Sequence, residues 1–173
     1  MYSVTKVIQF CYGHRLLNYQ GKCRYLHGHN GRVEIELASD RLDPRGMVWD
    51  FGEVKAVIQT WIDRELDHKM LLNRKDPALP ILRRMGEPVF IMDENPTAEA
   101  IAKQIFDYAR LQGLPVAVVR LWETAASVAT YSLDSARTLG FAKRRRRGRS
   151  GLRFAAERRR KAPRRVRSMA TAA

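Results

Sequence analysis

The sequence has no hydrophobic run long enough to cross a membrane, and it contains little cysteine. A membrane-spanning helix needs about 18 consecutive apolar residues, whereas Arg120 interrupts the apolar stretch between Pro115 and Trp122. Cys11 and Cys23 are the two cysteines, and no apolar signal segment precedes them. We therefore expect both thiols to be reduced, in a cytoplasmic protein without a membrane span.

Acidic residues are nearly absent from the last part of the chain. From Phe141 onward there are 14 Lys and Arg residues and one acidic residue, Glu157, whereas residues 1–140 are close to neutral. Because the basic part has few large apolar residues, burial would not offset the entropy lost on ordering it. We predict one domain over residues 1–138 and a basic, disordered tail over residues 139–173.

The charge distribution also bears on nucleic-acid binding. The predicted domain is nearly neutral, so nucleic-acid binding is not the expected main function. The arginine runs of the tail could neutralise several phosphates. Because the tail has few aromatic residues on which bases could stack, nonspecific contact with nucleic acid is the expected behaviour there.

Hydrophobic periodicity predicts two helices and a sheet. Period-two patterns indicate strands, and 3.6-residue patterns indicate a helix after Asp50 and another after the Asn95-Pro96-Thr97 sequence, ending near Gly113. The strands are predicted at residues 4–10, 32–37, 116–122 and 128–132, with a short strand at 89–92, and residues 73–87 are predicted to form a loop. This order indicates an α+β fold, in which two helices pack on one face of a four-stranded antiparallel sheet.

Three of the four histidines lie near the N-terminus, beside predicted strands. His27 and His29 project to the same side of an extended segment, and a neighbouring strand end would place His14 opposite them. Three neutral imidazoles with one open position are typical of catalytic zinc. Taken alone, the His-Gly-His motif is equally consistent with a polar turn.

Three further side chains could carry chemistry. Cys23 lies four residues before His27 and is a candidate base or nucleophile, although a free cysteine is more often a small buried apolar residue. The adjacent pair Asp67 and His68 has the components of a proton relay. The alternative is a histidine stabilised by the dipole at the end of a helix.

Several blocks of sequence resemble the 6-pyruvoyltetrahydropterin synthase family and follow the family's order over about residues 1–133. They are GHRL at 13–16, KCRYLHGHN at 22–30, GMVWDF at 46–51, LDH at 66–68, NPTAE at 95–99 and WET at 122–124. The resemblance implies a tunnelling fold (T-fold), in which sheets from several subunits join into an oligomeric barrel. It also implies a homo-oligomer, expected to be a hexamer of two trimers, with active sites between chains.

The resemblance also implies roles for individual residues. His14, His27 and His29 would hold one Zn²⁺ per subunit, and Cys23, Asp67 and His68 would transfer protons. Glu123 would bind the amino-pyrimidine edge of a pterin, with Thr97 lining the same pocket.

The short spacing between Cys23 and His27 resembles the bacterial carboxytetrahydropterin branch of the family. That branch acts in queuosine biosynthesis and converts a pterin triphosphate, 7,8-dihydroneopterin triphosphate, to 6-carboxy-5,6,7,8-tetrahydropterin, acetaldehyde and triphosphate. The alternatives are formation of 6-pyruvoyltetrahydropterin, another pterin side-chain cleavage, or a different class of protein that binds nucleic acid through the basic tail.

Overall fold

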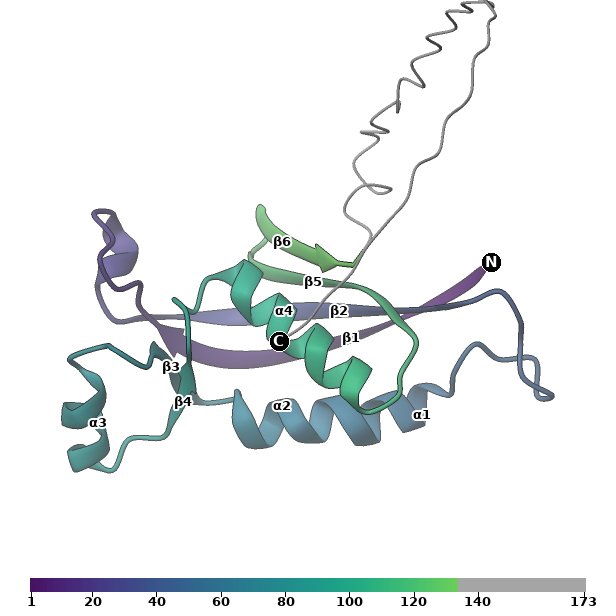
Figure 1. Ribbon diagram of the computed structural model, residues 1–173, viewed down its shortest axis with the longest axis horizontal. Helices are drawn as coiled ribbons and strands as arrows, with labels where there is room; N and C mark the ends of the chain where they lie inside the picture. The colour runs from purple at the N-terminus through teal and green to yellow at the C-terminus, as the bar shows by residue number, and fades with distance from the viewer. Residues whose placement is uncertain (134–173) are drawn as a thin grey trace, which may run out of the picture. The chain divides into compact units, whose positions relative to one another are not determined.

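The structure, a computed structural model, describes residues 1–133, so the predicted domain boundary and basic tail lie outside the described residues. A six-stranded sheet has the order β4-β3-β1-β2-β5-β6 (Figure 1). The strands are β1 (Tyr2–His14), β2 (His27–Ser39), β3 (Lys69–Asn73), β4 (Val89–Met92), β5 (Val116–Thr124) and β6 (Ser127–Ser132). The α+β fold class predicted from the sequence is confirmed. The sheet has two more strands than the predicted four, namely β4, which was predicted as a short strand, and β3, which was not predicted.

The long antiparallel ladder between β1 and β2 is the centre of the sheet. It is continuous from the Tyr2–Ser39 pair to the His14–His27 pair. Because side chains alternate along a strand, Ile8, Phe10 and Tyr12 all point to one face of the sheet, where they are buried. This alternation continues to His14 and puts it on the core face at the very end of the strand.

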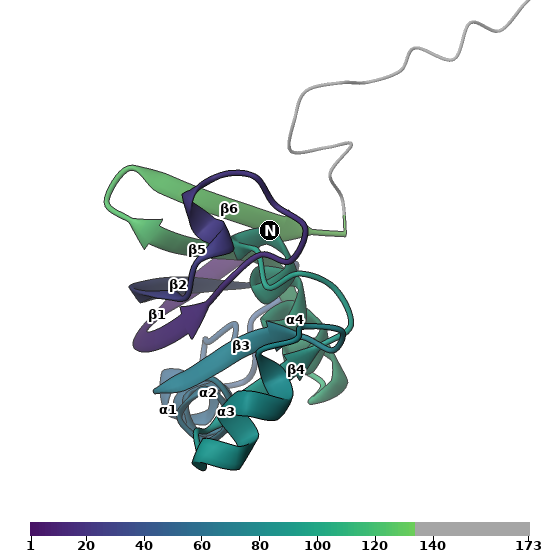
Figure 2. The ribbon, with the colours of Figure 1, turned by 90° about the vertical axis from the view of Figure 1, so that its left-hand side faces the viewer.

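Two helical segments cover that core face (Figure 2). The first runs through α1 (Phe51–Val54), a π-helical turn η2 (Lys55–Gln59) and α2 (Thr60–Glu65). The Asp50 side chain caps its start by accepting a hydrogen bond from the Gly52 N–H at 2.6 Å. The second, α4 (Ala98–Leu111), packs over β5 and β6. In residues 1–133 no helix has the length and apolar character needed to cross a membrane.

The predicted four-stranded antiparallel sheet was incomplete, because β3 and β4 add parallel pairings. β3 pairs in parallel with the last three residues of β1, and β4 pairs in parallel with β3. The predicted loop over residues 73–87 also contains a helix, α3 (Leu79–Met85). Pro80 occupies its first turn, where proline is tolerated, and Gly86 ends it with a φ of 81°.

Candidate functional site

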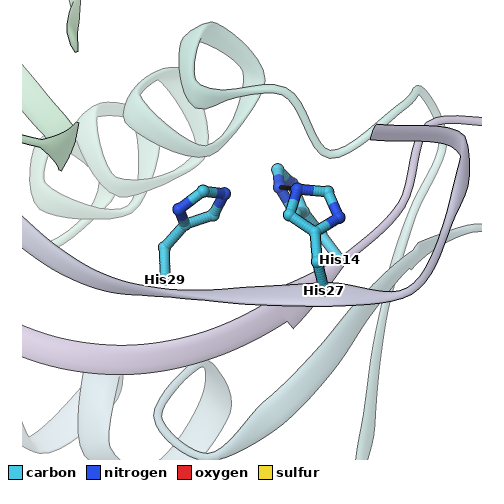
Figure 3. Close-up of side chains that lie close together, drawn as sticks. All are labelled: His14, His27 and His29. Carbon is cyan, nitrogen blue, oxygen red and sulfur yellow. Dashed lines mark hydrogen bonds between the residues drawn. The ribbon is translucent and has the colours of Figure 1, made fainter. Parts of the chain in front are cut away.

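Three imidazoles converge where β1 ends and β2 begins. His14 and His27 are a cross-strand pair, and His29 extends from the same side of β2 (Figure 3). The His29 ring centroid lies 5.0 Å from each of the other two centroids, and the three candidate ligand nitrogens lie within 4.8 Å of one another. The three histidines therefore lie close together, as the sequence predicted.

Backbone carbonyls fix which nitrogen of two rings carries the proton. The Nδ1–H of His14 donates to the Pro96 carbonyl at 2.6 Å, and the Nδ1–H of His27 donates to the Tyr25 carbonyl at 2.8 Å. In the neutral rings both Nε2 atoms are then unprotonated, yet they lie 3.0 Å apart. The contact requires either a second proton on one ring or a cation shared by both.

The environment of His14 favours the shared cation. The side chain is 3% exposed, and burial lowers the pKa of His14 below its usual value. A second proton on this ring is therefore costly, whereas metal ligation requires the neutral imidazole. The residues present fit a metal ion bound by His14, His27 and His29.

A carboxylate and a phenol lie next to the histidines. Glu123 Oε1, near the end of β5, is 3.8 Å from His14 Nε2. The same oxygen accepts a hydrogen bond of 2.9 Å from the hydroxyl of Tyr12, which lies on β1. Burial and the neighbouring Glu123 charge raise the pKa of Tyr12 far above its usual value, so the phenol remains a proton donor. Tyr12 was not predicted from the sequence, because it also fits the period of the buried strand face.

Cys23 and Thr97, both predicted as site residues, line the same cavity as Glu123 and His14. A cavity of about 330 Å³ is lined by His14, Cys23, Thr97 and Glu123. Thr97 caps α4 by accepting a hydrogen bond from the Ala100 N–H at 3.3 Å. Cys23 lies on the short helix η1 (Lys22–Arg24). One candidate metal ligand, His14, therefore shares this cavity with a thiol and a carboxylate.

Asn95 fixes the loop that carries Cys23. Its side-chain oxygen accepts from the Leu17 N–H at 2.9 Å, and its amide donates to the Leu17 carbonyl at 2.8 Å. The neighbouring Leu16 N–H donates to the Cys23 carbonyl at 2.8 Å. The Asn-Pro-Thr sequence thus holds the loop, orients His14 through Pro96 and starts α4, three functions that the sequence alone did not separate.

Asp67 and His68 lie with Cys11 rather than with Cys23. Asp67 Oδ1 accepts from the Cys11 N–H at 2.8 Å, and the His68 N–H donates to the Cys11 carbonyl at 2.7 Å. The side chain of Cys11 points to the face opposite Tyr12, because successive side chains alternate. Potential ligand atoms of Cys11, Asp67 and His68 also lie within 4.8 Å of one another. Within one chain, the structure does not bring the dyad to the cavity of Cys23.

The geometry of the dyad suits proton transfer. Asp67 Oδ2 accepts from the His68 Nδ1–H at 2.7 Å, which leaves His68 Nε2 as the unprotonated nitrogen of the neutral ring. The His68 side chain is 78% exposed, and its backbone has a φ of 54°, a left-handed conformation that is uncommon for histidine. The dyad therefore presents an oriented imidazole to the outside of the chain.

An α+β sheet with a three-imidazole cluster at one end and a thiol and carboxylate beside it defines a candidate metal-dependent enzyme. The pattern of the family described as "6-pyruvoyl tetrahydropterin synthase" matches residues 3–134. The chain belongs to this family.

Curated relatives share a more specific name. Proteins named 6-carboxy-5,6,7,8-tetrahydropterin synthase include one from Rickettsia felis, 40% identical over 107 residues that make up 61% of this chain and 78% of the relative. One from Rickettsia typhi is 37% identical and the alignment covers 72% of this chain and 95% of the relative. One from Aquifex aeolicus is 33% identical, with 75% and 97% covered.

Solved structures show the same fold. An uncharacterized protein from Wolinella succinogenes has a TM-score of 0.66 at 27% identity, and the match covers 77% of this chain and 98% of that one. The 6-pyruvoyl tetrahydropterin synthase of Caenorhabditis elegans has a TM-score of 0.56 at 23% identity, with 76% and 94% covered. The second match supports the fold alone.

Proposed function

We propose that this protein is a zinc-dependent lyase that converts 7,8-dihydroneopterin triphosphate and water to 6-carboxy-5,6,7,8-tetrahydropterin, acetaldehyde and triphosphate. This reaction belongs to queuosine biosynthesis. The observation that carries the proposal is the cavity lined by His14, Cys23 and Glu123, because His14 also belongs to the three-histidine cluster. Family membership and the shared name of the curated relatives support the same reaction.

In this proposal His14, His27 and His29 hold the zinc ion through side-chain nitrogens. Zinc, when bound, polarises the oxygens of the substrate side chain and acidifies the adjacent C–H bond. Pro96 and Tyr25 support this role, because their carbonyls orient two of the rings with Nε2 available as ligand.

Glu123 is proposed to bind the pterin. A carboxylate accepts two hydrogen bonds and therefore matches the two parallel N–H donors of an amino-pyrimidine edge. Glu123 Oε1 lies 3.8 Å from His14 Nε2, so a pterin bound by Glu123 would lie next to the histidine cluster. Thr97 lines the same cavity and would limit the position of the ring.

Cys23, Asp67 and His68 are proposed to transfer protons. Because the dyad and Cys23 are separated within one chain, we propose that the dyad of one subunit serves the cavity of another. The sheet ends at β4 and β6 within the described residues, and such edges are able to pair with a further strand. A homo-oligomer follows, and we propose a hexamer with composite active sites.

Mixing two inactive variants tests the composite site. Cys23→Ala and His68→Ala proteins are unfolded and refolded together, so that their subunits exchange at random. If each site takes its thiol from one chain and its imidazole from another, about a quarter of the sites are intact, and about a quarter of the wild-type rate returns. If the two residues of one chain act together, mixing restores no activity.

The direct test of the reaction is anaerobic incubation of zinc-loaded protein with 7,8-dihydroneopterin triphosphate. Mass spectrometry identifies the pterin, and a coupled assay measures acetaldehyde. Carboxytetrahydropterin together with acetaldehyde is the expected result, and Cys23→Ala protein with full zinc content should lose most turnover. A pyruvoyl product would instead assign the alternative reaction of the family, and unchanged turnover by Cys23→Ala would remove the thiol from the mechanism.

The cytoplasmic location and the basic tail remain predictions from the sequence. We propose that residues 139–173 make nonspecific contacts with nucleic acid and take no part in the reaction. Protein truncated after residue 138 should retain turnover and zinc content, and should lose salt-dependent retention on a DNA column. Loss of turnover on truncation would contradict the proposed division of the chain.

A further inference from the structure

We propose that Tyr12 is a positioning residue that holds the Glu123 carboxylate in place for the pterin and keeps it from becoming a metal ligand. This inference rests on the proposed function, because it concerns the same cavity. It adds a residue that neither the sequence motifs nor the relatives' names assign to the site. Its basis is a hydrogen bond that spans three strands of the sheet.

The Tyr12 hydroxyl reaches from β1 across β2 to β5. Tyr12 is 3% exposed, and its O–H donates to Glu123 Oε1 at 2.9 Å. The ring makes an edge contact with His14 at a centroid distance of 5.4 Å and lies 5.7 Å from the His29 ring centroid. Tyr12 therefore touches both the candidate metal ligands and the candidate pterin ligand.

Gly31 on β2 makes room for this arrangement. A Cβ atom at Gly31 would lie 2.9 Å from Tyr12 Cε1, which is closer than real Cβ contacts allow, so the tyrosine ring would have to move. The tyrosine ring thus occupies space that any other residue at position 31 would fill. The glycine and the tyrosine form a matched pair that delivers the hydroxyl to Glu123.

The hydrogen bond from Tyr12 to Glu123, which we call the tether, matters because the Glu123 carboxylate lies close to the candidate metal ligands. Its Oε1 atom lies 3.8 Å from His14 Nε2, and a carboxylate oxygen is an ordinary ligand of Zn²⁺. A small side-chain rotation would add a fourth protein ligand and fill the position that a catalytic zinc site keeps open. The hydrogen bond from Tyr12 opposes that rotation, so Glu123 remains available to the substrate.

In protein loaded with Co²⁺ instead of Zn²⁺, azide binding measures whether the fourth ligand position of the metal is open, and this measurement needs no substrate. Azide binding to the cobalt ion is followed through the visible absorption spectrum in wild-type protein and in Tyr12→Phe, which keeps the ring but removes the hydroxyl. We expect the dissociation constant of azide to rise about tenfold in Tyr12→Phe, and cobalt release to a chelator to slow by a similar factor. Tyr108→Phe is the matched control, because Tyr108 stacks on Trp61 away from the cavity, and it should behave as wild type.

Two further variants isolate the cause. Adding Glu123→Gln to Tyr12→Phe removes the released carboxylate, and azide affinity should return to the wild-type value. Gly31→Ala retains the hydroxyl but displaces the ring, and it should weaken azide binding as Tyr12→Phe does. In the pterin assay, Tyr12→Phe should raise KM by a larger factor than it lowers kcat, because the pterin loses a correctly placed partner.

The outcomes separate this inference from the proposed reaction. Wild-type azide and cobalt affinities in both Tyr12→Phe and Gly31→Ala would overturn the tether, whatever the substrate. If the wild-type protein converts no pterin but Tyr12→Phe still weakens azide binding, the tether stands and the proposed reaction fails.

Discussion

Replacing Asn95 by alanine removes the two hydrogen bonds that hold the loop carrying Cys23. The Asn95 side chain contacts the Leu17 N–H at 2.9 Å and the Leu17 carbonyl at 2.8 Å, and both bonds are partly buried. Each neutral hydrogen bond contributes about 1 kcal/mol, and a backbone group left without a partner costs a further amount. We therefore expect Asn95→Ala to lower the free energy of unfolding by about 2–3 kcal/mol.

The Asn95→Ala variant should also lose activity, and the cause of that loss differs from the cause of its lower stability. The three histidines retain their contacts, so metal content should remain one ion per chain. Because Leu16 pairs with the Cys23 carbonyl, release of the loop displaces the thiol, and kcat should fall several-fold under conditions where the protein is folded. Urea unfolding, metal analysis and the pterin assay measure the three quantities on one preparation.

Gln112→Ala serves as the control, since it removes an amide of similar size from an exposed position just beyond α4. Its free energy of unfolding should stay within about 0.5 kcal/mol of wild type. Equal stability of Asn95→Ala and Gln112→Ala would refute the reasoning, because the two hydrogen bonds would then contribute nothing.

Three other predictions concern the same region. Arg15→Ala leaves the fully buried Asp76 carboxylate without its bidentate partner, and urea unfolding should show a loss of about 3 kcal/mol. His27→Ala should lower the metal content from one ion per chain to none by elemental analysis, whereas His68→Ala should not change it. Because burial lowers the pKa of His14, the unfolded chain takes up this proton more readily. The metal-free protein should lose stability below about pH 6.5, and His14→Gln should reduce that loss.

The part of the site that follows from strand periodicity was predictable. The two-residue spacing of His27 and His29 places both on one side of β2, and the end of β1 supplies His14 as the cross-strand partner of His27. The two main helices were predictable for a similar reason, because Asp50 and Thr97 mark their starts with caps that depend on local sequence. The spacing of residues in the sequence was sufficient to predict those features that depend on the regular period of a strand or a helix.

The remaining features depend on contacts between distant segments. β3 is only five residues long, has no alternating pattern and forms parallel pairs with β1 and β4. The parallel direction comes from the chain path between the strands, which no short window of sequence contains. Likewise, Pro80 and Gly86 suggested a loop, although they are the start and stop of α3.

The position of Asp67 and His68 shows that β1 separates two sets of candidate functional residues, which lie on opposite faces of the sheet. Tyr12 and His14 point to the helix-covered face, whereas Cys11, which binds the dyad through its backbone, points to the other face. A shift of one residue in β1 would reverse this division. Since β1 is paired along its whole length with β2, its register is fixed, and the dyad remains with Cys11 while Cys23 lines the other cavity. If all three residues act in one reaction, as proposed, assembly of several chains is a requirement of the chemistry as well as a means of covering sheet edges.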